Sequence, residues 1–393
     1  VRRIFGAVMN INDYLSKLLL IIFCSISLAA FAADPAPPDV FQRHDPYSNL
    51  EIGYEDLDSL LRTVVLDIGP SSREIAKPTN TSTGTRMRVK VNRATINEGN
   101  RFYFEIFANN EENQQIIRNI RSRLENIPAA IPLERFSRKE QLAYWINLYN
   151  VTILGEIVKV YPRRDLKGLL VGKRSILSKQ TLNIAGVPLS LNDIHFTILR
   201  HNYDNNPLII YGLYQGIIGG PNIRKFAYSG RNIYGELAEN AVEFINSNRG
   251  TQSKNERVFR VSSLYERNDV FFDESGAGLE EHLLRYLEGE ERNELQAAAK
   301  IKKDISDWTV TDLYGSYREA VGSLADNYAA LMGAVSGAQT NYLTDRASKS
   351  RYSPAVTQQL DELNEKRESD EQEVIGIVTV EDLEKVDDDG IEE

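Results

Sequence analysis

The sequence predicts a helix-rich α+β fold with a small sheet and a central buried helix. Three observations support this: a helical stretch over 137–161 that is apolar on almost every side, amphipathic helical segments around it, and a few short strand-like runs between them. A helix without a polar face is buried all round. Few short strands among many helices favour a small sheet in an α+β fold.

The chain is expected to open with a secretory signal peptide over residues 1–32. A short polar segment precedes the apolar run Leu18–Leu28, and Ala30 and Ala32 fit the A-x-A cleavage rule. We place the cut after Ala32, which makes the mature protein periplasmic or secreted. The alternative is a leader kept as an anchor, although the run is shorter than the roughly 20 residues of a spanning helix. No stable membrane span is expected after cleavage.

The one cysteine of the chain, Cys24, lies inside this leader. It is preceded by bulky residues rather than by the small ones expected before a lipidated cysteine. The mature chain is therefore expected to have no thiol, which excludes thiol catalysis and disulfides and leaves stability to the core.

Two regions are expected before the main domain. Residues 33–50 are rich in proline and polar residues, which is typical of a linker. Residues 51–130 are expected to contain helices over Leu57–Ile68 and Glu111–Ile127, because apolar residues recur there at helical spacing. Between the helices, Arg86–Val91 alternates basic and apolar residues, which predicts a strand with one buried face.

The main domain is expected over 131–290, around a helix that begins at Ser137 and runs to Tyr161. Ser137-Arg-Lys-Glu140 has the form of a capping box. Asn147 and Asn150 lie on one side of this helix and need hydrogen-bond partners if they are buried. Those partners are either groups of the protein itself or a ligand.

Further elements follow this helix. Leu182–Val187 predicts a short strand with a turn at Ala185-Gly186, and Ser190-Leu-Asn-Asp193 is a second capping box that opens a helix over Leu191–Arg200. The apolar run Leu208–Tyr214 predicts a buried strand, followed by a glycine-rich loop over Gln215–Pro221.

The spacing next predicts a helix over Ile233–Ser247, a strand at Val258–Val261 and a helix over Leu279–Leu287. A C-terminal helical region is expected over 291–346, with its helix from Asp304 to Leu343.

The last part of the chain, 347–393, is expected to be an acidic, disordered tail. The net charge of the chain is −10, and the segment from Asp361 to the end accounts for the acidic excess. A body without a basic excess gives no electrostatic reason to bind nucleic acid or anionic lipid. The apolar island Val374–Val380 has an alternative interpretation as a strand added to a partner's sheet.

Three sets of segments stand out between Leu133 and Leu287, which are Glu140–Asn150, Ala185–Ile194 with Ile198–Arg200, and Gly220–Arg224 with Phe226–Tyr228. Through these segments the stretch resembles a bacterial and plant family called domain of unknown function 547. The family implies no settled biochemical activity.

This chain departs from the family pattern at two places. Typical members carry cysteines where this chain has Gln215 and Gly220, and a Glu-His pair where it has His195-Phe196. If the family's cysteine and histidine form a nucleophile and a base, this divergent member cannot run that reaction. Gln215 is then expected to hold or polarise a ligand at most.

Two functions of different classes remain. The first is a non-catalytic envelope protein that binds a small molecule, glycan or protein, since a glycine-rich loop after a buried strand can expose backbone amides to a ligand. Its candidate binding residues are Asn147, Asn150, Tyr214, Gln215, Gly216, Gly219, Gly220 and Arg224. The second is a hydrolase or transferase that uses His195, Asp193 and Gln215.

Metal and cofactor motifs are missing from the sequence. The four histidines are scattered along the chain, and neither a metal-ligand spacing, nor a P-loop, nor a dinucleotide fingerprint, nor a serine nucleophile elbow occurs. No metal and no cofactor are therefore expected.

Overall fold

The computed structural model describes residues 36–73, 94–95, 98–172, 174–255, 257–272 and 277–312. Several predictions fall outside these ranges. They are the leader over 1–32, the strand Arg86–Val91, the helical region beyond residue 312 and the acidic tail. Within the described part, no helix has the length and apolarity that crossing a bilayer requires.

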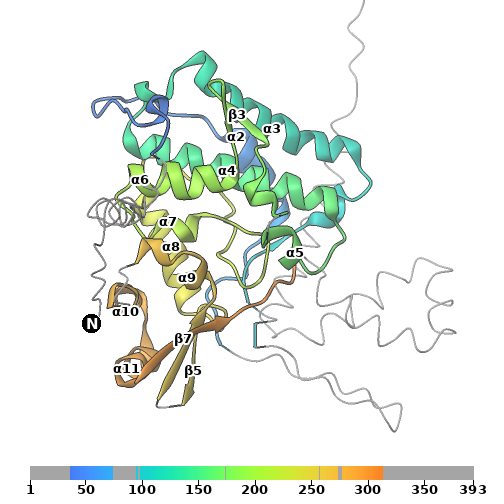
Figure 1. Cartoon of the computed structure of the whole chain (residues 1–393). Helices are drawn as coiled ribbons and strands as arrows, with labels where there is room; N and C mark the ends of the chain where they lie inside the picture. The colour runs from blue at the N-terminus through green and yellow to red at the C-terminus, as the bar shows by residue number, and fades with distance from the viewer. Residues whose placement is uncertain are drawn as a thin grey trace, which may run out of the picture.

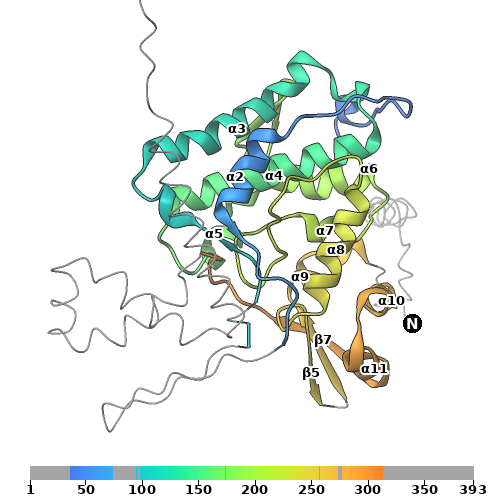
Figure 2. The ribbon, with the colours of Figure 1, turned by 180° about the vertical axis from the view of Figure 1, so that it is seen from behind.

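Two long helices lie side by side at one end of the molecule, α3 (Glu111–Ala130) and α4 (Arg138–Val160) (Figure 1). A shorter helix, α2 (Glu55–Val64), crosses the same end and is seen in front of α3 and α4 from behind (Figure 2). α2 is followed directly by β1 (Val65–Leu66). The helix therefore ends at Val64, four residues before the predicted end at Ile68. β1 pairs antiparallel with β2 (Arg101–Phe102).

The prediction of a central buried helix is confirmed in α4. Almost all of its residues from Glu140 to Leu154 are buried, so α4 has no polar face over most of its length. The Ser137 hydroxyl caps the helix by accepting the Glu140 N–H at 3.2 Å. The Glu140 carboxylate, however, does not complete a capping box. It accepts the backbone N–H of Ile52 at 3.0 Å and that of Gly230, and so fixes two distant segments to the first turn of α4.

A β-hairpin and a π-helix pack beside these helices. The hairpin joins β3 (Leu182–Ile184) to β4 (Val187–Leu189) through Ala185 and Gly186, both with positive φ, as the sequence predicts. The helix that follows is a π-helix, η5 (Asp193–Leu199), continued by the short α6 (Arg200–Asn202). Its capping box is confirmed, because the Asp193 carboxylate accepts the Ser190 N–H at 2.8 Å.

The prediction of a strand over Leu208–Tyr214 is wrong. Its first residues form the helical turn α7 (Ile209–Gly212), and an extended segment follows. Periodicity cannot separate a buried strand from a buried helical turn when every position is apolar. Two side-chain amides bind backbone carbonyls that a strand would use for pairing, Asn150 at Gly212 O and Asn240 at Tyr211 O, each at 2.9 Å.

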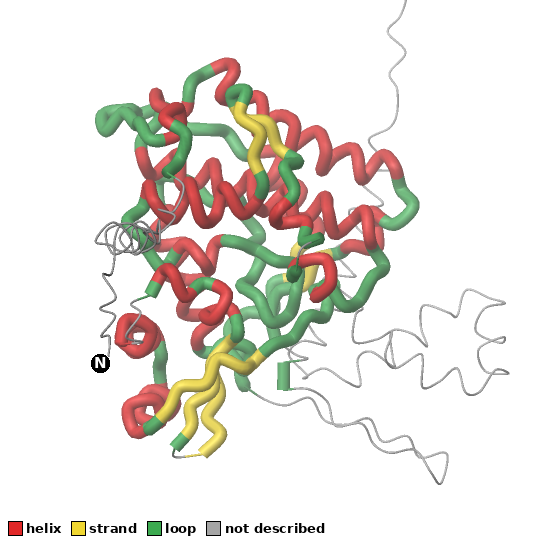
Figure 3. Tube along the Cα trace, in the orientation of Figure 1, coloured by secondary structure: helices red, strands yellow, loops and turns green. Residues whose placement is uncertain are grey.

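The other end of the molecule is built on α8 (Ile233–Ile245). α8 contacts α4, α7 and α10 (Ala277–Tyr286), and the next helix is α11 (Gly289–Ala297). The strands, drawn in yellow in Figure 3, include a three-stranded sheet at this end. Its order is β5-β6-β7, with β5 (Thr251–Asn255) antiparallel and β7 (Lys300–Ile305) parallel to β6 (Val258–Ser262).

The start of the predicted C-terminal helix is also wrong. Asp304 belongs to β7, and residues 306–312 continue as an extended segment, which we call the strap. The strap forms isolated bridges to Phe102, Asp165 and Ile217. β7 is a mostly polar, partly exposed strand that ends at buried Ile305, and pairing with β6 provides the hydrogen bonds that a helix would form locally. Residues from Phe41 to Val310 share one hydrophobic cluster.

Candidate functional site

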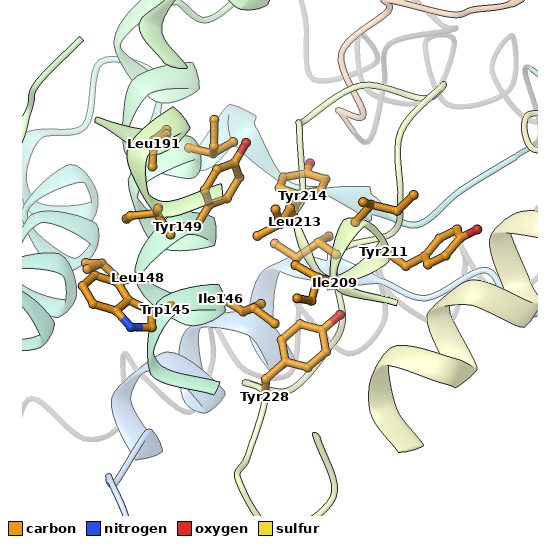
Figure 4. Packing of buried hydrophobic residues seen from close by; sticks show 14 of the residues in the cluster. Trp145, Ile146, Leu148, Tyr149, Leu191, Ile209, Tyr211, Leu213, Tyr214 and Tyr228 are labelled. Atoms are coloured by element: carbon orange, nitrogen blue, oxygen red, sulfur yellow. The ribbon is translucent and has the colours of Figure 1, made fainter. Parts of the chain in front are cut away.

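Two amides of α4 hold the segments around the glycine-rich loop. Asn147 donates to Tyr228 O at 2.8 Å and accepts the Tyr228 N–H at 2.9 Å. Asn150 donates to Gly212 O and accepts the Tyr214 N–H, both at 2.9 Å. Figure 4 shows the side chains of Leu213 and Tyr214 on the side of α4 that carries Ile146 and Tyr149, with Tyr211 farther from this helix. Both asparagines thus bind the protein's own backbone, the structural alternative that the sequence left open.

The glycines of the loop give close packing against other parts of the chain. A Cβ on Gly216, whose φ is +72°, would lie 2.0 Å from Ile157 of α4, and one on Gly219 would lie 2.6 Å from the Asp307 nitrogen of the strap. The Gly219 N–H donates to Asp307 O, and the Gly220 N–H donates to Ile217 O. The N–H groups of Gly219 and Gly220 are thus already paired, one with the strap and one within the loop, so a ligand contact through them stays a prediction that this pairing does not favour.

The two ends of the predicted site also have structural partners. Tyr214 is fully buried, and its hydroxyl hydrogen-bonds the Thr311 hydroxyl of the strap. Arg224 forms an ion pair with Glu239 of α8 at 2.9 Å and donates to Glu236 O at 3.1 Å. These residues fix the loop between the strap and α8.

Asp193 and His195, two candidate residues of the enzyme alternative, do not contact each other. The Asp193 carboxylate accepts both the N–H and, at 2.6 Å, the hydroxyl of Ser190. His195 is 5% exposed, and its ring centroid lies 4.0 Å from that of Phe196 and 5.4 Å from that of Phe271. Residues two apart in a helix point to different sides, so these side chains diverge.

Burial changes the chemistry of His195. It lowers the pKa of the imidazole to about 3, because the charged form loses its hydration there. Within the described residues neither ring nitrogen has a hydrogen-bond partner, and Nε2 is buried. A base with so low a pKa is neutral at pH 7 and accepts a proton poorly.

Gln215, a predicted site residue, is hydrogen-bonded to the guanidinium of Arg267. Its Oε1 accepts a hydrogen bond from Nη2 of Arg267 at 3.0 Å, and Nη1 of Arg267 donates to the Ser263 hydroxyl at 2.9 Å. The guanidinium carbon lies 4.8 Å from the ring centroid of Trp308, a residue of the strap. Arg267 ends the short helix α9 (Leu264–Arg267).

The electrostatics of Arg267 are unusual for a surface arginine. Burial lowers its pKa to about 10, opposed by its interactions with Tyr149 and Glu266. In the part of the chain that the structure describes, the guanidinium forms no ion pair with a carboxylate. Its two hydrogen-bonded partners, Gln215 and Ser263, are neutral, so its charge is not compensated by direct contact.

Tyr149 completes the cluster. Its ring packs edge-on against His195, with centroids 6.4 Å apart, and its phenol interacts electrostatically with Arg267. Burial raises the pKa of this phenol, so Tyr149 is a neutral hydrogen-bond donor at pH 7. We call Tyr149, His195, Gln215, Arg267 and Trp308 the Arg267 cluster.

Sequence reasoning found two of these five residues. Arg267 and Trp308 lie beyond the family motifs and carry no spacing signal, and Tyr149 looks like one more apolar position of the buried helix. Among the described residues, no group of three or more His, Cys, Asp or Glu side chains could hold a metal ion.

Comparison with known proteins gives one family match. Residues 133–245 match the family model described as "Protein of unknown function, DUF547". Searches among curated proteins and among solved structures found no match.

Proposed function

This chain carries a domain of unknown function 547, and we propose that it is a non-catalytic binding module of the cell envelope that holds a small molecule, glycan or protein segment at the Arg267 cluster. The observation that carries the proposal is the hydrogen bond between Gln215 and Arg267. Gln215 stands where family members typically have a cysteine, and it is bonded to a guanidinium without a carboxylate partner.

The placement of the candidate catalytic groups disfavours the hydrolase or transferase alternative. A general base works best with a pKa near the operating pH and within reach of a group that orients it. His195 has a pKa of about 3, and the Asp193 carboxylate is engaged by Ser190. Gln215 offers no nucleophile.

The rigidity of the loop favours binding. Asn150 and the strap fix the segment that carries Gln215, so its side chain is held in place before any ligand arrives. A site that is ordered in advance loses less conformational entropy when it binds.

Turnover and binding are tested with the same variants. Wild type and His195→Ala are assayed from pH 5 to 9 against panels of ester, amide and glycoside substrates. We expect no turnover that depends on His195. A pH-dependent rate that His195→Ala abolishes would overturn the non-catalytic proposal.

The binding arm uses ligands retained by protein purified from the envelope fraction and identified by native mass spectrometry. Gln215→Ala should weaken an identified ligand by about 1–3 kcal/mol, because a polar partner is left unsatisfied. The melting temperature is expected to change little. A change in stability without a change in affinity would indicate a purely structural role.

Export is the second part of the proposal. It follows from the apolar run before Ala30 and Ala32, and it predicts a mature chain that begins at Ala33. Intact-mass measurement on protein from the envelope fraction tests it. A chain that retains the leader would contradict cleavage.

A further inference from the structure

The guanidinium of Arg267 has more N–H donors than hydrogen-bond acceptors among the described residues. An arginine has five N–H groups in a planar fork, and the described residues accept only two hydrogen bonds from this one, at Gln215 and Ser263. The residue is partly exposed, so a ligand or water can approach its side chain. A cation without an anionic partner favours an anion in this place.

Two further groups of the cluster lack partners. Nε2 of His195 is fully buried and has no hydrogen-bond partner among the described residues. The hydroxyl of Tyr149 has no partner there either, but it is not one of the fully buried atoms. Buried polar atoms without partners are rare in folded proteins and call for an explanation. A ligand that accepts hydrogen bonds would satisfy both groups, because a neutral imidazole and a neutral phenol each carry one donor.

The surroundings restrict what the ligand can be. Trp308 covers the guanidinium, and Phe196 and Phe271 flank His195, so the walls are aromatic. The site offers one positive charge and neutral donors. One charge balances a carboxylate, whereas a phosphate dianion would remain undercompensated in a partly buried place. The planar fork of arginine also matches the two oxygens of a carboxylate.

We propose that the Arg267 cluster binds the carboxylate of a small organic acid with an apolar or aromatic body. Arg267 forms the ion pair, Tyr149 and His195 donate to the bound carboxylate, and Trp308 contacts the body of the ligand. This inference rests on the proposed binding function and specifies its ligand class.

The two tryptophans of the chain supply a probe and an internal control. Protein labelled with 5-fluorotryptophan is titrated with benzoate, its neutral analogue benzamide and inorganic phosphate, and followed by fluorine NMR. Trp308→Phe assigns the signals. The Trp308 signal should shift saturably with benzoate, while Trp145, packed against Phe41 in the core, should not respond.

Three variants locate the charge. Arg267→Lys removes the planar fork and should weaken benzoate about tenfold or more. Gln215→Glu keeps the arginine but places a carboxylate beside it. This carboxylate should compete with the ligand for the guanidinium and abolish benzoate binding. Arg231→Gln removes an exposed arginine that pairs with Glu51 at the surface and should change nothing.

Several results would overturn the inference. One is a Trp308 signal that does not respond to benzoate at concentrations up to about 10 mM, since so small a ligand is expected to bind in the millimolar range. Another is an unchanged benzoate affinity in the folded Gln215→Glu variant. Benzamide or phosphate binding as tightly as benzoate would refute the carboxylate but leave a binding module standing. Turnover dependent on His195 would refute the proposed function, whatever benzoate does.

Discussion

His195 shows how burial determines what a single side chain can do. Its ring lies among Phe196, Phe271 and Tyr149 and has no acidic partner in the described part of the chain. The positive charge is therefore disfavoured in the folded state but not in the unfolded chain, where the pKa of histidine is about 6.5. This difference links protonation to folding.

The sign of this linkage gives the first prediction. Since the folded pKa of about 3 lies below the unfolded value, the unfolded chain binds more protons between these pH values. The stabilisation is complete above about pH 6.5 and is lost as the pH falls. From pH 7 to pH 5 the loss is about 2 kcal/mol for this one residue.

Urea unfolding of wild type and His195→Phe at pH 7 and pH 5 measures this loss. Phenylalanine suits the aromatic surroundings and cannot titrate, so the variant should lose about 2 kcal/mol less than wild type. His44→Gln, a change at an exposed histidine, is the control. Equal pH dependence in wild type and His195→Phe would show that His195 is not buried as described.

Asn147 gives a second prediction at this scale. Its amide pairs with both the N–H and the C=O of buried Tyr228. Asn147→Ala leaves these two groups unpaired and should lower the free energy of unfolding by about 2–4 kcal/mol. Exposed Asn126→Ala in α3 is a matched control. Denaturant unfolding with no loss in Asn147→Ala would contradict the anchoring role.

At the scale of elements, the strap and the glycine-rich loop form one unit. Backbone hydrogen bonds join Thr311 N to Gly216 O, Ile218 N to Thr309 O and Gly219 N to Asp307 O, each at 2.9 Å. The strap also carries Trp308 to Arg267. Its pairing therefore supports both the loop and the candidate site.

This pairing predicts opposite effects of alanine at two glycines. Gly219→Ala places a Cβ 2.6 Å from the strap backbone and should cost about 1–3 kcal/mol. Gly155→Ala in α4 meets only Ile117 at 3.5 Å and should stabilise the helix by about 0.5–1 kcal/mol. Thermal unfolding of both variants checks the contrast. Equal effects would argue against close contact between loop and strap.

At the scale of the whole molecule, charge and core lie in different parts of the chain. The hydrophobic cluster reaches from Phe41 to Val310, whereas the acidic excess lies beyond Asp361, outside the described residues. Deleting Asp361–Glu393 should raise the isoelectric point and barely change the melting temperature. Calorimetry and isoelectric focusing check this. Loss of cooperative unfolding would show that the apolar island at Val374–Val380 belongs to the core.

The helices with strong local signals could be predicted from the sequence. The Ser137 cap, the apolar circumference of α4 and the turn at Ala185-Gly186 each depend on neighbours within a few residues. Local sequence determines such features because their hydrogen bonds and rotamers are local. The Ser190–Asp193 cap was predicted for the same reason.

Only the tertiary structure decided the elements and contacts that depend on distant partners. Leu208–Tyr214 and the strap have no distinctive period. The first receives hydrogen bonds from Asn150 and Asn240, and the second pairs with the glycine-rich loop. The Arg267 cluster joins residues of α4, η5, the loop, α9 and the strap. Two of its members, Tyr149 and Trp308, are 159 positions apart in the sequence. The sequence by itself determined the family match over residues 133–245 and the buried helix, while the leader remains a prediction. Which side chains meet was decided by packing, because burial and charge at a site depend on residues that no local pattern connects.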